Sequence, residues 1–219
     1  MTTAVKICGL TRPDDVAAAI AAGADYVGAI LVPASRRTVA MDALPALFAA
    51  AAGRAKRVAV TVDPDDDVLD RLATSGAVDF VQLHGHESAA RVAAVRRRTG
   101  LGVVKALPVA VADDLRDVAG YAAVADLLLF DAKPPPGASA GGNGLTFDWR
   151  LVRAIDAGPT PWGLAGGLDP TNVQQAVRLT GAGFVDVASG VETAPGRKDH
   201  DLVRAFVAAA KRPPDGGKE

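Results

Sequence analysis

Short runs rich in β-branched residues alternate along the chain with longer runs rich in alanine and leucine. Short apolar runs bounded by turn residues are typical of strands buried on both faces, and the longer runs are typical of helices. This pattern predicts strands at residues 5–8, 26–32, 56–62, 79–83, 103–107, 127–130, 162–165 and 184–188. Between and after them it predicts helices at 14–22, 41–52, 87–98, 112–119, 147–155, 170–179 and 199–211, with one more that starts in the acidic run 63–67 and ends near residue 75.

Parallel strands need crossover helices, and eight strand–helix units in roughly 200–250 residues are typical of a closed barrel. The sequence therefore predicts an α/β protein with one domain, a (β/α)8 TIM barrel over residues 1–211, followed by a disordered tail at 212–219. The alternative, a doubly wound open sheet, is disfavoured by the number of strands. It is also disfavoured because no Gly-x-Gly-x-x-Gly turn follows the first strand.

One segment interrupts the alternation. Residues 133–146 contain three consecutive prolines and four glycines. A loop of this length inside a compact domain is either functional or disordered, and the alternation resumes directly after it. We expect this loop to be able to close over a ligand and exclude water.

Composition narrows the possible partners. The chain has 24 basic and 25 acidic residues and a formal net charge of -1, so we expect no binding to nucleic acid or to an anionic membrane. A single cysteine excludes an internal disulfide, and three histidines are few for a metal enzyme. We see no leader peptide and no apolar run long enough to span a membrane, and we expect a cytoplasmic protein.

Polar residues follow several predicted strands, at the end of a parallel barrel where ligands bind. These candidates are Cys8, Arg36, Arg37, Gln82, His84, Lys105, Asp131, Gly166, Gly167, Ser189 and Gly190. Each also has an ordinary structural explanation. A lone cysteine is most often a small buried apolar residue, an aspartate at a strand end can cap a turn, and most arginines are solvated loop charges.

Position favours a chemical role for two of them. Cys8 ends the first strand, and Lys6 lies two residues earlier on the same face, where an ammonium group favours a thiolate. Asp131 ends a wholly apolar strand, and partial desolvation favours the protonated form of a carboxyl group, as a general acid requires.

Glycines follow the last two strands. In (β/α)8 enzymes these two loops commonly bind a phosphate through backbone N–H groups, because glycine lets the backbone come close to the ligand. Gly166 and Gly167 after the seventh strand, with Ser189 and Gly190 after the eighth, therefore predict a phosphate site.

Several motifs together resemble those of phosphoribosylanthranilate isomerases. The resemblance runs from the first strand to the last helix and rests on motifs that occur in the same order along the chain. These are Lys6-Ile7-Cys8-Gly9-Leu10-Thr11, Gln82-Leu83-His84-Gly85, Asp131 with Gly141-Gly142-Asn143-Gly144 and Phe147-Asp148-Trp149, Leu164-Ala165-Gly166-Gly167-Leu168, and Asp186-Val187-Ala188-Ser189-Gly190-Val191-Glu192.

The resemblance implies an Amadori rearrangement in tryptophan biosynthesis that uses no cofactor and no metal ion. It implies that Asp131 is the general acid, which protonates the ribose ring oxygen, and that Cys8 is the general base, which removes the proton from C2 of the sugar. It further implies a phosphate site at the glycine loops and a contact between Arg37 and the anthranilate carboxylate. Lys6, Gln82, His84 and Asp186 are assigned to substrate binding, and the protein is expected to be a monomer or a homodimer.

The chain departs from the family pattern at a few positions. Arg36 stands where a proline is usual, which leaves open whether Arg36 or Arg37 meets the substrate carboxylate, and Asn143 stands where threonine or serine is usual. Other phosphate-binding barrels are the main alternatives. A ribulose-phosphate epimerase would need metal-binding histidines and acids, an indole-glycerol-phosphate synthase would need a catalytic lysine with a glutamate partner, and a non-enzymatic phosphate-binding module would need neither Cys8 nor Asp131.

Overall fold

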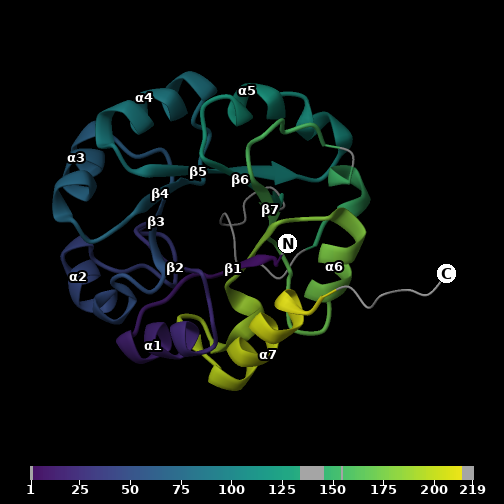
Figure 1. The fold of residues 1–219 in the computed structure, drawn as a ribbon. Helices are drawn as coiled ribbons and strands as arrows, with labels where there is room; N and C mark the ends of the chain where they lie inside the picture. The colour runs from purple at the N-terminus through teal and green to yellow at the C-terminus, as the bar shows by residue number, and fades with distance from the viewer. Residues whose placement is uncertain (1, 134–145, 154, 214–219) are drawn as a thin grey trace.

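The computed structural model describes residues 2–133, 146–153 and 155–213. Eight parallel strands close into a barrel, in which β8 pairs with β1 (Figure 1). The strands are β1 Ala4–Ile7, β2 Tyr26–Ile30, β3 Lys56–Thr61, β4 Phe80–Leu83, β5 Gly102–Val109, β6 Leu127–Ala132, β7 Trp162–Leu164 and β8 Phe184–Val187. Each strand is hydrogen-bonded to its neighbours in the sequence, so the predicted (β/α)8 barrel is confirmed.

Helices surround the barrel on its outer side, as Figure 1 shows. The α-helices are α1 Pro13–Ala21, α2 Leu44–Leu47, α3 Asp66–Ser75, α4 Ala89–Thr99, α5 Val118–Ala122, α6 Val173–Thr180 and α7 His200–Lys211. Local sequence sets their ends. Asp65 caps α3 by accepting a hydrogen bond from the N–H of Val68 at 2.8 Å, and Gly76 ends the helix in the left-handed conformation.

The predicted helix at 41–52 is wrong as a continuous element. It consists of the 3-10 turn η1 Met41–Ala43, the single α-turn α2 and a second 3-10 turn, η2 Ala49–Ala51. Pro45 lacks an N–H and fits only the first turn of a helix, so the α-helical part begins at Leu44. Leu44, Phe48 and Ala51 are nevertheless buried, which explains the helical spacing in the sequence.

Two more predicted helices are shorter than expected. The segment 112–119 forms the 3-10 turn η3 Ala112–Leu115 and part of α5. Among the described residues of the segment 147–155, the helical part is the 3-10 turn η4 Trp149–Val152. Asp114 Oδ2 accepts hydrogen bonds from the N–H groups of Ala110 and Val111, and these contacts fix the start of η3.

A small hairpin follows β8 and was not predicted. After the 3-10 turn η5 Ser189–Val191, strands β9 Glu192–Ala194 and β10 Arg197–Lys198 pair in antiparallel fashion. Gly196 makes the turn with a φ of 80°. Strands this short show too little alternation to be recognised in a sequence.

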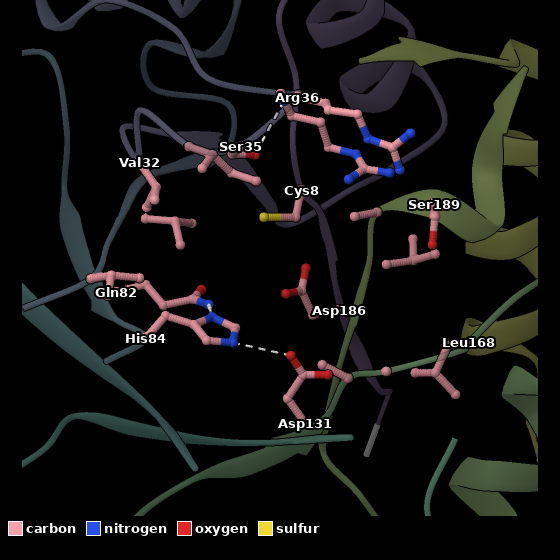
Figure 2. Close-up of a pocket in the computed structure, with 18 of the residues that line it drawn as sticks. Cys8, Val32, Ser35, Arg36, Gln82, His84, Asp131, Leu168, Asp186 and Ser189 are labelled. Carbon is pink, nitrogen blue, oxygen red and sulfur yellow. Dashed lines mark hydrogen bonds and ion pairs between the residues drawn. The ribbon is translucent and has the colours of Figure 1, made fainter. Parts of the chain in front are cut away.

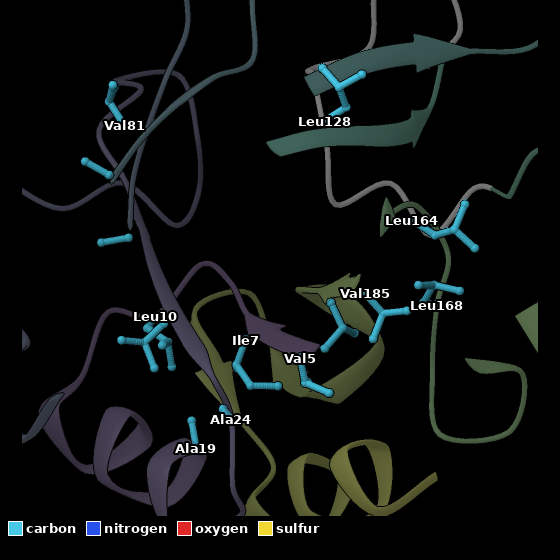
Figure 3. Close-up of a cluster of buried hydrophobic side chains, with 14 of the residues drawn as sticks. Val5, Ile7, Leu10, Ala19, Ala24, Val81, Leu128, Leu164, Leu168 and Val185 are labelled. Carbon is cyan, nitrogen blue, oxygen red and sulfur yellow. The ribbon is translucent and has the colours of Figure 1, made fainter. Parts of the chain in front are cut away.

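Alternation along the strands divides the core into an outer and an inner layer. Val5 and Ile7 of β1 belong to the outer layer of buried apolar residues (Figure 3). Inside the barrel, the ring of Tyr26 makes edge contacts with the rings of Phe80 and Phe184, at centroid distances of 5.7 Å and 5.2 Å. These three residues begin their strands, so they fill the amino-terminal end of the barrel and leave the carboxyl end for a site.

Candidate active site

A cavity of about 270 Å³ opens at the carboxyl ends of the strands (Figure 2). Its lining includes most of the site residues that the sequence predicts, namely Cys8, Arg37, Gln82, His84, Asp131, Gly166, Gly167, Asp186 and Ser189. Three candidates are not among the lining residues: Lys6, Gly190 and Lys105, the last of which is described below. Lys6 is buried below Cys8 on β1, and Gly190 lies behind Ser189 in η5.

Cys8 lies at the end of β1 with its side chain in the cavity (Figure 2). Gly28 on β2 makes room for it, because a Cβ atom at that position would lie 2.9 Å from Lys6 Cε and 3.1 Å from Cys8 Sγ. A glycine inside an apolar strand often marks such a close approach. Gly28 was therefore a sign of the site in the sequence, although it was not among the predicted site residues.

Burial raises the pKa of the Cys8 thiol; Lys6 opposes this effect and Asp186 adds to it. The net direction is upward, whereas the sequence alone had suggested that Lys6 would lower it. Burial outweighs the lysine because the Lys6 ammonium group is shared. Lys6 Nζ donates hydrogen bonds to Asp186 Oδ2 and Gln82 Oε1, each at 2.9 Å.

Lys6 itself stays a cation. Burial lowers its pKa, but the Asp186 carboxylate, followed by Cys8, raises it by more, and the net shift is upward. Asp186 keeps one oxygen, Oδ1, buried and without a hydrogen-bond partner in the described part of the chain. The floor of the cavity is therefore a lysine–carboxylate pair with unused hydrogen-bonding capacity next to the thiol.

Asp131 lies next to the last residue of β6, on another side of the cavity from Cys8 (Figure 2). Its Oδ1 accepts a hydrogen bond from the N–H of Ala132 at 2.8 Å, and its Oδ2 lies 3.1 Å from His84 Nε2. His84 Nδ1 in turn lies 3.0 Å from Gln82 Nε2. The cavity thus brings together a thiol and a carboxyl group, the second held by a histidine.

Arg37 is buried beside the unpredicted hairpin. Its Nε lies 2.9 Å and 3.1 Å from the two carboxylate oxygens of Glu192, and its Nη2 lies 2.7 Å from Glu192 Oε2. Lys198 Nζ donates to the same carboxylate at 2.9 Å and to the carbonyl oxygen of Ala188. Burial raises the pKa of Glu192, but hydrogen bonding to Arg37 and the charge of Lys198 lower it by more. Glu192 and Lys198 were not predicted as site residues.

The loops after β7 and β8 pack closely against the acid and against each other. Gly166 and Gly167 are left-handed, with φ values of 82° and 59°. A Cβ atom on Gly166 would lie 2.7 Å from Asp131 Oδ1, and one on Gly190 would collide with the backbone of Leu168. Only glycine fits at these two points, which agrees with loops that bring their backbone close to a ligand.

The cavity also has an apolar wall, which the sequence analysis did not identify. The residues that form it are Ile30 of β2, Val32 after β2, Val60 of β3, Val62 after β3, and Leu168. In the sequence these residues look like ordinary strand residues. An apolar wall opposite polar groups is typical of a pocket that holds a small organic ligand.

Lys105 does not belong to the site, although the sequence placed it among the candidates. It is not among the residues that line the cavity, and its Nζ pairs with Glu87 Oε2 at 2.7 Å. On β5 its neighbours Val104 and Ala106 belong to the apolar cluster inside the barrel, so Lys105 points outward.

The described part of the chain contains no group of three or more histidine, cysteine, aspartate or glutamate side chains that could hold a metal ion. No helix within residues 2–133, 146–153 and 155–213 is long and apolar enough to cross a membrane. The loop that was expected to close over the ligand and the predicted C-terminal tail lie largely outside the described residues.

The model of the N-(5'phosphoribosyl)anthranilate (PRA) isomerase family matches residues 5–209 of the chain. An N-(5'-phosphoribosyl)anthranilate isomerase from Rhodopseudomonas palustris strain BisB18 is 53% identical over 212 residues, which cover 96% of this chain and 97% of that protein. A protein of the same name from Paramagnetospirillum magneticum is 51% identical, over 96% of this chain and 98% of its own length.

Solved structures show the same likeness. A phosphoribosyl anthranilate isomerase from Thermotoga maritima superposes with a TM-score of 0.85 at 32% identity, covering 95% of this chain and 98% of that one. Another structure of such an isomerase, in complex with reduced 1-(o-carboxyphenylamino)-1-deoxyribulose 5-phosphate, has a TM-score of 0.82 at 31% identity and the same coverage. A third is described as monomers generated from the dimeric enzyme of Thermotoga maritima, with a TM-score of 0.81, 32% identity and the same coverage.

Proposed function

Because the chain belongs to the N-(5'-phosphoribosyl)anthranilate isomerase family, we propose that Cys8 and Asp131 carry out the reaction of that family in this protein. The reaction is an Amadori rearrangement of tryptophan biosynthesis. It converts N-(5'-phosphoribosyl)anthranilate into 1-(2-carboxyphenylamino)-1-deoxyribulose 5-phosphate and needs no cofactor. The observation that carries the proposal is that both side chains line one cavity, from β1 and β6.

Each residue has one proton to move. Asp131 gives its proton to the ribose ring oxygen while the nitrogen lone pair forms a C=N bond to C1, so the C1–O bond breaks and the ring opens. Cys8, as thiolate, then removes the proton from C2, and the C2–H electrons form a C1=C2 bond as the C=N electrons return to nitrogen. The enolamine tautomerises to the C2 ketone. A positioned acid or base of this kind contributes about 10²–10⁴-fold to the rate.

The glycine loops are suited to hold the phosphate. Gly166, Gly167 and Ser189 line one side of the cavity, and Gly190 keeps the loop after β8 close to the loop after β7. Backbone N–H groups in left-handed and turn conformations form concave sites for anions. A phosphate held there would place the sugar between Cys8 and Asp131.

Arg37 is suited to receive the anthranilate carboxylate. Glu192 occupies its Nε and Nη2 atoms, while Nη1 has no hydrogen bond to Glu192, and Arg37 lines the cavity. A guanidinium group that is fixed along one edge presents its remaining N–H groups in a defined direction, which lowers the entropy cost of binding a carboxylate. The apolar wall formed by Ile30, Val60 and Leu168 would contact the aromatic ring.

The test is conversion of the anthranilate riboside, followed as the loss of anthranilate-type fluorescence. Cys8→Ala and Asp131→Asn should each lower kcat by about 10²–10⁴-fold, while binding of a reduced product analogue persists. Arg36→Lys is the matched control for Arg37→Lys. We expect the Arg37 variant to raise KM far more than the Arg36 variant does.

Full activity in the Cys8 or Asp131 variant would refute the role given to that residue. A wild-type protein that binds the phosphorylated analogue but never turns over the riboside would instead be the non-enzymatic phosphate-binding module considered above. Sedimentation of the purified protein will decide between monomer and homodimer.

A further inference from the structure

A row of hydrogen bonds runs along the lining of the cavity from the Lys6–Asp186 pair near Cys8 to the carboxyl group of Asp131. Lys6 Nζ donates to Gln82 Oε1 at 2.9 Å, Gln82 Nε2 lies 3.0 Å from His84 Nδ1, and His84 Nε2 lies 3.1 Å from Asp131 Oδ2. Figure 2 shows the histidine between the amide and the acid. Asp186 accepts from Lys6 at the other end of the row.

The chemistry of Lys6 fixes the direction of every bond in this row. An ammonium group can only donate, so the group of Gln82 that faces Lys6 must be the oxygen. The amide nitrogen then faces His84 and can only donate, so His84 Nδ1 must accept. The imidazole proton is therefore on Nε2, where it is donated to Asp131.

From this geometry we propose that Gln82 is a positioning residue, which holds His84 as the neutral Nε2–H tautomer and through it orients Asp131. The proposal rests on the acid role of Asp131 proposed above. A protonated His84 would set an Nδ1–H against the amide hydrogens of Gln82, so the row opposes formation of the imidazolium ion.

A neutral histidine matters because of what the acid has to do. An imidazolium ion in contact with a carboxyl group strongly favours the carboxylate and would leave Asp131 without a proton to give. A neutral N–H orients the oxygen without adding a full charge. Gln82 thus protects the acid by keeping its neighbour uncharged.

The remaining charged groups near His84 are themselves paired. The Lys6–Asp186 pair comes from β1 and β8 and lies beyond Gln82. The Lys105–Glu87 pair lies behind β4, where Lys105 Nζ donates to the carbonyl oxygens of Leu83 and Gly85. The other ionisable group nearby is the thiol of Cys8. The carboxyl group in direct contact with the imidazole of His84 is therefore that of Asp131.

The row does not carry protons from Cys8 back to Asp131. After one turnover the thiol has gained a proton and the carboxyl group has lost one. Passing a proton through Gln82 would require its amide to become an imidic acid, and the Lys6 ammonium group holds the amide oxygen in place. The protons must return through product or solvent, and the row serves for orientation.

The direct test is the tautomeric state of the three histidines in the resting protein, read from their ¹⁵N chemical shifts in a pH titration. The signals of His84 are assigned by their loss in His84→Gln. We expect an unprotonated Nδ1 and a protonated Nε2 in the resting protein. A cationic His84 near neutral pH, or a proton on Nδ1, would overturn the proposal.

The second test changes the direction of one bond. Gln82→Glu keeps the shape and the contact with Lys6 but presents an acceptor to Nδ1, so His84 should gain a proton there and become cationic. We expect kcat to fall about 10²-fold, the low end for one positioned proton donor, with a smaller change in KM. Gln175→Glu on the exposed face of α6 is the matched control and should change neither.

A double variant separates the orienting role from a general charge effect. If Gln82 acts through His84, Gln82→Glu will have little further effect on kcat in the His84→Gln background. An undiminished effect there would refute the proposal. The histidine spectra require no turnover, so they stand even if the Asp131 variants prove active, in which case only the proposed acid role fails.

Discussion

Two lysines on the eight strands of the barrel, Lys6 and Lys105, are buried in ion pairs. The two pairs differ in how many of their hydrogen-bonding positions are filled. Lys6 is 1% exposed and pairs with Asp186 inside the barrel, and Lys105 is 2% exposed and pairs with Glu87 on the outside. Burying such charges costs several kcal/mol per ion unless hydrogen bonds replace the lost water. The two pairs meet that requirement to different degrees.

The outer pair is saturated. Lys105 Nζ donates to Glu87 Oε2 and to the carbonyl oxygens of Leu83 and Gly85, which uses all three of its hydrogens. Glu87 in turn accepts from the N–H groups of Asp63 and Gly85. This pair joins β5 to the loop after β4 and has no capacity left for a ligand.

The inner pair is not saturated. Lys6 donates two hydrogens to protein oxygens, which leaves its third for the Cys8 sulfur, the group whose charge also raises the pKa of Lys6. Asp186 Oδ1 is buried without a partner among the described residues. An unfilled hydrogen-bonding position in a buried pair is costly, and such positions concentrate where the chain does chemistry.

The largest expected effect is that of Lys6→Met. The variant leaves Asp186 buried and unpaired, which should lower the free energy of unfolding by about 3–5 kcal/mol. It also removes the cation that favours the Cys8 thiolate, so kcat should fall by about 10²-fold or more. Denaturant unfolding and the fluorescence assay measure the two losses.

The double variant Lys6→Met with Asp186→Asn separates the loss of stability from the loss of activity. Removing both charges relieves the buried unpaired carboxylate, so stability should recover in part. Activity should stay low, because the thiolate still lacks its cation. If activity returned together with stability, Lys6 would have only a structural role.

Lys105→Met should affect stability alone. Glu87 is left buried without its cation, so we again expect a loss of about 3–5 kcal/mol in the free energy of unfolding. The kcat of the protein that remains folded should stay within about threefold of wild type, because Lys105 does not line the cavity. A drop in kcat as large as that for Lys6→Met would show that the outer pair also supports the site.

The strands of the two lysines explain why the sequence indicated the direction of the Lys6 side chain but not that of Lys105. Lys6 shares a strand face with Cys8, a polar pair that marks the inward side of β1. On β5, Lys105 shares its face with Val103 and Leu107, while Val104 and Ala106 lie on the other face. All four are buried, so apolar residues occupy both faces and the direction of the lysine cannot be read from the sequence. Position near a strand end was the reason to place Lys105 at the mouth of the barrel, and this prediction was wrong.

The sequence shows which residues lie at strand ends but not which distant residues they contact, and this explains the other residues that it did not identify. Cys8, Asp131 and the glycine loops mark strand ends, and a barrel brings strand ends together whatever the spacing between them. The contacts that tune these groups join residues far apart in the chain. Lys6 and Gln82 are 76 positions apart, and Arg37 and Glu192 are 155 apart, with Glu192 on a hairpin too short to predict. The upward direction of the Cys8 pKa also depends on burial, which only the packed barrel shows.

The smallest and most specific effect should come from Asp186→Asn, which keeps the shape of the side chain and removes only its charge. The Asp186 carboxylate raises the pKa of Cys8, and it also draws Lys6 away from the sulfur. Both effects disappear in the variant, so the pKa of Cys8 should fall and alkylation of this single cysteine should begin at lower pH. The alkaline rise of kcat/KM should move in the same direction.

The matched control is Asp67→Asn on the exposed surface of α3, which removes the same charge far from the sulfur and should leave the alkylation profile unchanged. Because the protein has one cysteine, the rate of iodoacetamide labelling against pH reports on Cys8 without correction for other thiols. Lys6→Met must shift the profile to higher pH, the opposite of Asp186→Asn. If the two variants moved it in the same direction, the shift would reflect opening of the cavity, and the inner pair would not tune the thiol electrostatically.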